Sequence, residues 1–335
     1  MSSAPTPSEI VSDARWLAQA LDPASGMVRV VEMDADSYRS ASFLDDRMLQ
    51  DQHFAGIVPW ASVAEALPED ARTDARWIFH IGHVGSTLVS RLLGELDGVL
   101  SVREPRSLRD VAMLPAERRA AFVPPIQKLM SRTFADEQTV LVKATSFVSE
   151  IAPELVPPGE RALFLYAKPR AYVASILAGE NSVRELSALA PSRTQRIAGR
   201  AELPEPTSAA GAAAAAWACE MTALEASAEA MPNRHLAWAD FDEILDDMPG
   251  ALERTATLFG FAAPAERIRE IATGPLMGRY SKALEHEYSP SLRRDLIAEA
   301  AGANREDIDS ALAMLQSAAA TSPLLARALD RAKES

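Results

Sequence analysis

Residues 77–88 read WIFHIGHVGSTL. The apolar run Trp77–Ile81 is typical of a buried strand, and leucines at helical spacing predict a helix over residues 86–96. Between the two lie Gly82 and Gly85, which permit a tight turn and a close approach of the backbone to an anion. The stretch therefore predicts a strand, a glycine turn and a helix, the local arrangement of a phosphate-binding loop.

Four further short apolar runs each precede a helical stretch. They cover residues 98–102, 139–143, 162–166 and 235–238. Continuous apolar strands that alternate with helices indicate a parallel sheet covered on both faces. The sequence predicts an α/β three-layer sandwich with a central parallel sheet of about five strands, a phosphate-binding loop after the first core strand, and helical insertions.

The sequence predicts two regions, an N-terminal extension and the α/β domain. Residues 1–75 are expected to form an N-terminal extension that packs on the core, with one strand or hairpin at 27–33 and a helix from Val63. Residues 76–335 are expected to form the α/β domain. It carries a helical insertion at about 178–230, including an alanine-rich helix over 209–228, and a helical C-terminal region.

The composition of the chain disfavours several classes of binding partner. The net charge is −13, which disfavours non-specific binding to nucleic acid or to anionic membranes. No apolar stretch is long enough to span a bilayer, and the first residues do not resemble a secretory signal, so a cytoplasmic protein is expected. The one cysteine, Cys219, is expected at a buried helix position, and neither cysteine nor histidine spacing predicts a metal site.

The turn itself excludes two common nucleotide loops. It lacks the lysine and the spacing of the ATPase and GTPase loop, and it does not match the dinucleotide fingerprint. Ser86 and Thr87 instead add hydroxyl donors to the backbone amides. A turn that serves only to reverse the chain is the competing interpretation.

The segment Gly82–Thr87 resembles the 5′-phosphosulfate loop of the PAPS-dependent sulfotransferases, particularly their bacterial branch. Residues 166–177, YAKPRAYVASIL, resemble the family's second signature, with Ser175 in the position of the serine that holds the 3′-phosphate. Residues 103–105, 143–145, 238–241 and 278–282 also resemble family landmarks. The resemblance covers about residues 76–294.

This resemblance implies a sulfotransferase that moves a sulfonyl group from PAPS to a hydroxyl or amine of a small-molecule or glycan acceptor. Adenosine 3′,5′-bisphosphate is the implied product, and no metal is required. The implied donor-binding residues are Gly82, His83, Val84, Gly85, Ser86, Thr87, Lys168, Arg170, Ser175, Arg279 and Lys282.

Two positions depart from the family pattern. His83 stands where the family usually has lysine or arginine, and Ala167 stands where the family has the arginine that pairs with the 3′-phosphate. A histidine stabilises negative charge when it is protonated or when it donates a hydrogen bond. Lys168 or Arg170 would have to replace the missing arginine, and lysine acts only as a point charge.

Glu104 is the expected catalytic base, because it follows the second strand and so lies near the switch-point crevice, as the acidic base does in several sulfotransferase branches. His83 is the second expected catalytic residue, and Lys143 is a further candidate to counter charge on the leaving group. A carboxylate base works best with a raised pKa, which Arg103 and Arg106 would oppose. The alternative for Glu104 is an ordinary ion pair with one of those arginines.

Two other functions stay open. A nucleotide-dependent phosphotransferase would use the same loop, although the sequence lacks the loop lysine and a clear acidic pair for Mg²⁺. A non-catalytic nucleotide-binding protein with a decayed sulfotransferase site is kept open by Ala167 and His83. His80 is expected to be a core residue whose polar atoms have partners, and Asp240 a helix cap or a member of a structural pair.

Overall fold

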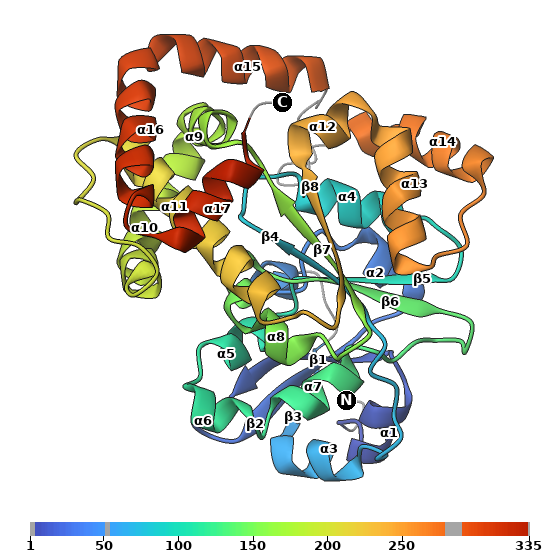
Figure 1. The fold of residues 1–335 in the computed structure, drawn as a ribbon. Coiled ribbons are helices and arrows are strands. Elements are labelled where there is room, and N and C mark those ends of the chain that lie inside the picture. Colours follow the sequence, from blue (N-terminus) through green and yellow to red (C-terminus); the bar gives the residue numbers. More distant parts are fainter. Residues whose placement is uncertain (1–3, 51–53, 279–289, 334–335) are drawn as a thin grey trace.

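The computed structural model describes residues 4–50, 54–278 and 290–333. Its centre is a five-stranded, fully parallel sheet in the order β5-β6-β4-β7-β8 (Figure 1). The strands are β4 (Arg76–His80), β5 (Val99–Arg103), β6 (Thr139–Lys143), β7 (Arg161–Tyr166) and β8 (His235–Asp240). The predicted parallel sheet is confirmed, with strand ends shifted by at most two residues.

The middle strand, β4, is buried on both faces. Trp77, Ile78 and Phe79 are each at most 1% exposed. Phe79 pairs in register with Phe164 of β7, which pairs in turn with Trp238 of β8, and their rings meet edge to face at 5.8 and 4.9 Å between centroids. Such cross-strand aromatic contacts stabilise the pairing and fix its register.

Helices cover both faces of the sheet, as the three-layer prediction requires (Figure 1). On one side lie α4 (Ser86–Leu93), α12 (Phe241–Asp246), α13 (Met248–Phe259) and α14 (Ala265–Thr273). On the other side lie α8 (Ala152–Leu155), α9 (Pro169–Leu177), α10 (Glu180–Ile197), α11 (Ala209–Glu229), α15 (Pro290–Ala303), α16 (Arg305–Ala319) and α17 (Pro323–Arg331).

The alanine-rich helix α11 is part of the core. Most of its residues are buried, including Trp217 and Cys219, which are both fully buried as expected for the cysteine. Small alanine side chains allow neighbouring helices to approach closely on several sides, so this helix packs against α9, α10, α16 and α17. Residues 146–151, which form a 3₁₀ helix, also pack against it.

Before the parallel sheet, the chain forms a second, antiparallel sheet. Its strands are β1 (Trp16–Asp22), β2 (Met27–Glu32) and β3 (Phe54–Pro59), and its helices are α1 (Pro7–Ser12), α2 (Ala35–Ser40) and α3 (Trp60–Ala66). The sequence indicated β2 and a helix close to α3, but not β1 or β3. This N-terminal unit packs β1 on α5 (Arg106–Ala112) and α2 on β5 (Figure 1).

A buried arginine joins this unit to the core. Arg103, the last residue of β5, is 1% exposed. Its guanidinium donates hydrogen bonds to the carbonyls of Tyr38, Arg39 at 3.1 Å and Ala41 at 2.7 Å, all at the end of α2. In return its own carbonyl accepts the Leu44 amide at 2.8 Å. The segment after α2 is thereby held against the carboxyl end of β5.

Replacing Arg103 with leucine should loosen this junction. Arg103→Leu removes a charged donor and leaves several carbonyls without a partner, so we expect a loss of about 2–4 kcal/mol in the free energy of unfolding. Chemical denaturation measures it. The matched control is Arg39→Met, because the Arg39–Asp36 pair is largely exposed and should be worth under about 1 kcal/mol. Equal losses in the two variants would contradict the assigned role of Arg103.

Candidate functional site

The loop between β4 and α4 has an unusual backbone. Gly82, His83 and Gly85 all adopt left-handed conformations, with φ of 79°, 56° and 59°. Histidine seldom takes positive φ, so the surrounding structure must hold it there. Left-handed residues that lead into a helix direct successive amides towards one point, which is the geometry of anion-binding loops.

Donors at the start of α4 are free. In the described ranges, the amides of residues 84–88 donate no hydrogen bond to protein groups, and no side chain caps the helix. The hydroxyls of Ser86 and Thr87 likewise have no partner among the described residues, although both side chains are nearly buried. Unsatisfied amides at a helix N-terminus carry its positive dipole end. This part of the loop is therefore suited to binding an anion.

Phe241 explains why position 85 is glycine. The phenyl ring, 2% exposed, lies so close to Gly85 that a Cβ atom there would overlap it. Phe241 is the first residue of α12, whose N-terminus is capped by Asp240 through bonds of 2.9 and 3.1 Å to the amides of Asp242 and Glu243. The expected cap role of Asp240 is confirmed. The residue that follows β8 thus packs its aromatic ring against the loop.

A methyl group at position 85 should distort the loop. We expect Gly85→Ala to lower the free energy of unfolding by about 2–5 kcal/mol, from backbone strain plus overlap with Phe241. Gly26→Ala separates the two causes, because Gly26 also has positive φ, of 68°, but nothing lies within 4 Å of its added Cβ. That control should lose only about 1–2 kcal/mol. Similar losses measured by thermal unfolding would rule out the overlap with Phe241.

Beside the loop, a buried carboxylate meets two cations. Glu104 directly follows β5, has φ of 53° and is 7% exposed. Its amide donates to the Lys143 carbonyl at 2.7 Å, and its carboxylate accepts a hydrogen bond from the Lys143 ammonium. Arg47 donates to the second carboxylate oxygen at 3.1 Å. The carboxyl ends of β5 and β6 are thus joined by a buried ion pair.

These cations are not the ones that the sequence suggested. Arg103 is bound to the N-terminal unit, and Arg106 donates to Asp46 at 2.6 Å and to Asp110 at 3.2 Å. Both arginines were expected near Glu104 because they are its neighbours in the chain. Strand pairing instead brings Lys143 to Glu104, since Arg103 and Lys143 are register partners in β5 and β6.

The electrostatics of Glu104 differ from those that a carboxylate base was expected to need. Burial acts to raise the pKa of Glu104, but the Lys143 ammonium and the imidazole of His80 act more strongly and lower it well below its usual value. Glu104 is therefore ionised at neutral pH. The raised pKa that efficient base catalysis would favour is absent, because the positive charge of Lys143 is in direct contact.

Removing one partner of this ion pair should lower the free energy of unfolding more than replacing both partners with apolar residues. Glu104→Gln leaves the Lys143 charge buried without its partner, and we expect a loss of about 3–5 kcal/mol in unfolding free energy at pH 7. The double variant Glu104→Leu with Lys143→Met should recover much of that loss. Because the folded-state pKa of Glu104 is lowered, its contribution is complete above the unfolded-state value of about 4.3 and declines at lower pH.

Denaturation curves at pH 7 and pH 3.5 test this prediction. The difference between wild type and Glu104→Gln should be smaller at the lower pH, where the unfolded wild-type chain takes up a proton. A difference that grows as the pH falls, or a double variant less stable than Glu104→Gln, would contradict the ion-pair assignment.

Arg47 is a site residue that sequence reasoning missed. It lies in the segment after α2, half exposed, with its guanidinium stacked 3.5 Å from the Phe43 ring centroid and bound to Asp45. The ammonium of Lys143 lies 5.5 Å from the same ring. No local pattern in residues 43–47 predicts this contact, because the segment reaches the site only through its attachment to β5.

His83 extends from the loop towards the other face of the sheet. Its Nε2 atom lies 3.7 Å from a carboxylate oxygen of Glu185 in α10, and its ring meets Tyr172 of α9 edge to face at 6.4 Å. The side chain is 12% exposed.

Three further expected donor residues lie at the start of α9 or along it. Lys168 precedes the helix and lies 3.5 Å from Glu243 of α12, the helix that begins with Phe241, whereas Arg170 is paired at 2.5 Å with Asp309 of α16. Ser175 donates to the Tyr172 carbonyl at 2.8 Å. Ala167 is 2% exposed, and its carbonyl accepts the Trp217 indole N–H at 2.8 Å. Arg279 and Lys282 lie outside the described residues.

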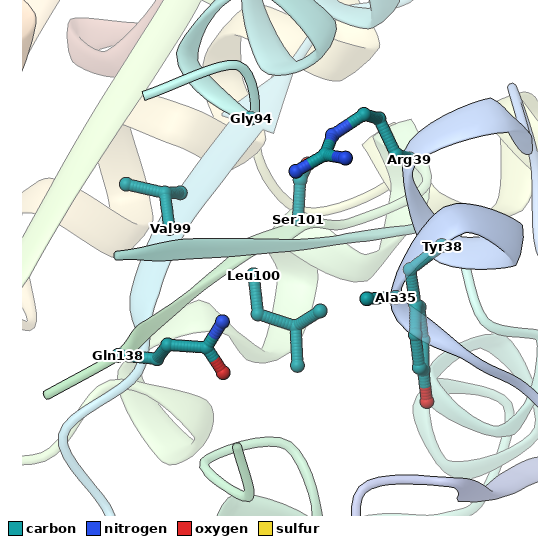
Figure 2. Close-up of a pocket in the computed structure, with 8 residues that line it drawn as sticks. All are labelled: Ala35, Tyr38, Arg39, Gly94, Val99, Leu100, Ser101 and Gln138. Carbon is teal, nitrogen blue, oxygen red and sulfur yellow. The ribbon is translucent and has the colours of Figure 1, made fainter. Parts of the chain in front are cut away.

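A small cavity lies away from these groups. Figure 2 shows it between β5 and α2, with a volume of about 30 Å³ and with Tyr38, Leu100 and Ser101 among its lining residues. That volume holds about one or two water molecules. No loop residue lines it, so the cavity is separate from the candidate site.

The described ranges hold neither a cluster of metal-binding side chains nor a candidate membrane-spanning helix. No group of three or more His, Cys, Asp or Glu side chains is arranged there to hold a metal ion. Nor does any helix in those ranges combine the length and apolar character needed to cross a membrane.

Comparison with known proteins gives matches among solved structures alone. No protein-family model and no curated protein matches the sequence. Among solved structures, the chain is similar to a sulfotransferase domain from the curacin biosynthetic pathway, with 11% identity, a TM-score of 0.41, and coverage of 70% of this chain and 98% of that one. The chain is also similar to the sulfotransferase domain from the Synechococcus PCC 7002 olefin synthase, with 12% identity, a TM-score of 0.40, and coverage of 68% of this chain and 89% of that one.

Mouse sulfotransferase SULT7A1, solved as a complex with PAP, is also similar. It is 10% identical, with a TM-score of 0.42 and coverage of 78% of this chain and 90% of that one.

Proposed function

We propose that this chain is a sulfotransferase that moves a sulfonyl group from PAPS to a hydroxyl or amine of a small-molecule or glycan acceptor. The observation that carries the proposal is the set of free donors at the start of α4, the amides of residues 84–88 and two hydroxyls. They follow the central strand of a parallel sheet, where ligands of such folds bind.

The loop fits the phosphosulfate end of the donor. A phosphosulfate is an anion rich in oxygen acceptors, and free amides with serine and threonine hydroxyls are matching donors. Transfer of a phosphoryl group from ATP would favour a loop lysine and the longer glycine spacing, and this loop has neither. Sulfonyl transfer is therefore the better match to these residues.

When bound, PAPS would supply a sulfonyl group whose bond to the bridging oxygen breaks, with the electron pair leaving on the nucleotide phosphate. The amides of Val84 to Thr87 and the Ser86 hydroxyl would hold the anionic oxygens. His83, beside Glu185, would stabilise the charge that develops on the leaving phosphate. Preorganised donors of this kind act most strongly where charge develops in the transition state.

Glu104 would act on the acceptor side. Its ionised carboxylate would accept a hydrogen bond from the acceptor hydroxyl or amine and so orient it. A carboxylate with a lowered pKa is a weak base, but the acceptor proton becomes strongly acidic once the new bond to sulfur is advanced. The proton would therefore pass to Glu104 late in the step. Lys143 and Arg47 would hold this carboxylate in place.

The nucleotide's 3′-phosphate would be held by Lys168 and Ser175. Lys168 lies against α12, whose first residue packs on the loop, whereas the pairing of Arg170 with Asp309 turns its guanidinium towards α16. Arg279 and Lys282 remain proposed donor-binding residues on the strength of the sequence resemblance. A non-catalytic nucleotide-binding protein is the second candidate, favoured by the buried Ala167 in place of an arginine.

Calorimetric titration with adenosine 3′,5′-bisphosphate tests the proposal, with AMP and with ATP plus Mg²⁺ as controls. The bisphosphate should bind most tightly. Lys168→Met and Ser175→Ala should each weaken it by about tenfold to a hundredfold, as expected for hydrogen bonds to a charged group. Arg170→Met is the matched control, and it should change the affinity by less than about threefold, because Arg170 is already paired.

Other outcomes favour other functions. Preference for ATP with Mg²⁺ would favour a phosphotransferase. Bisphosphate binding without consumption of PAPS across a broad panel of acceptors would favour the non-catalytic candidate. No binding of any of the three nucleotides would reject the proposed function.

A further inference from the structure

His80 makes a contact that an ordinary core histidine does not need. It ends β4, is 5% exposed, and accepts a hydrogen bond at Nδ1 from the Gly82 amide at 3.0 Å. Its other ring nitrogen, Nε2, has no hydrogen-bond partner among the described residues and lies 3.7 Å from the Glu104 carboxylate. The side chain thus stands between the phosphate loop and the buried ion pair.

The contact requires a neutral ring. Because Nδ1 accepts the Gly82 amide, the ring proton resides on Nε2, facing Glu104. Burial lowers the pKa of His80, and the Lys143 ammonium acts in the same direction, while Glu104 acts in the opposite one. A proton added at Nδ1 would abolish the bond to Gly82.

This bond lies where the chain turns. A side-chain acceptor that binds the amide two residues ahead closes a tight turn, as asparagine and aspartate do in Asx turns. Gly82 and His83 then follow in left-handed conformations. The bond occupies the Gly82 amide, so the free amides of the loop begin further on, at residues 84–88.

We propose that His80 is a positioning residue, which holds the phosphate loop in its anion-binding conformation by accepting the Gly82 amide. The inference rests on the proposed function for the identity of the anion, but the turn itself is independent of that identity. A simple core role predicts that any replacement of similar size acts alike. A positioning role predicts that only a replacement with a hydrogen-bond acceptor keeps the loop in its anion-binding conformation.

Asparagine and leucine give a matched pair of replacements. Both branch at Cγ and are similar in size, but only His80→Asn places an oxygen where it accepts the Gly82 amide. Three quantities are measured on each: amide hydrogen exchange at Gly82, affinity for adenosine 3′,5′-bisphosphate and for inorganic pyrophosphate, and melting temperature. His80→Leu should expose Gly82 to exchange and weaken both ligands by about fivefold to tenfold. His80→Asn should stay within about threefold of wild type and protect Gly82.

Equal affinities and equal Gly82 exchange in the two variants would overturn the proposal, whatever their melting temperatures. If the wild type binds neither ligand, the proposed function fails, and the exchange of Gly82 alone decides the role of His80. Should His80→Leu not fold, long-range ¹H–¹⁵N spectra of the wild type supply the answer. A proton on Nε2 is expected, and a proton on Nδ1 would overturn the inference.

Discussion

The parallel alignment of the five core strands is the constraint on which the rest of this structure depends. When all strands run the same way, every carboxyl end reaches the same edge of the sheet, and each connection must return across a face. His80, Glu104, Lys143 and Asp240 all lie at or just beyond strand ends. Residues far apart in sequence are thereby gathered around one loop.

Buried charged side chains then join neighbouring strands and the N-terminal unit at this edge of the sheet. The Glu104–Lys143 pair joins neighbouring strands, and Arg47 brings the N-terminal unit to the same carboxylate. Buried ion pairs seldom add much net stability, but a missing partner is costly, so each such contact strongly favours one arrangement. Arg103 acts in the same way on the carbonyls at the end of α2. The N-terminal unit therefore contributes to the candidate site as well as to the core.

The predictions that were confirmed came from local patterns in the sequence. Short apolar runs located all five core strands, because the strands of a parallel sheet covered by helices are rich in apolar residues. Cys219 was recognised as a buried helix residue from its apolar neighbours. The antiparallel strands β1 and β3 were missed. β1 carries the polar Gln19 among its apolar residues, and β3 contains Gly56 and ends at Pro59, two residue types that are depleted in strands.

The sequence by itself determined the α/β class, the order of the core elements along the chain and the place of the glycine loop after the central strand, because these follow from side chains within a few residues of one another. Only the tertiary structure decided which charges meet Glu104, which amide His80 accepts, and that Arg47 reaches the site. Coulomb interactions depend on distance in space, and Lys143 and Arg47 are brought to Glu104 by strand pairing and by packing of the N-terminal unit. Nothing in the residues next to Glu104 along the chain carries that information.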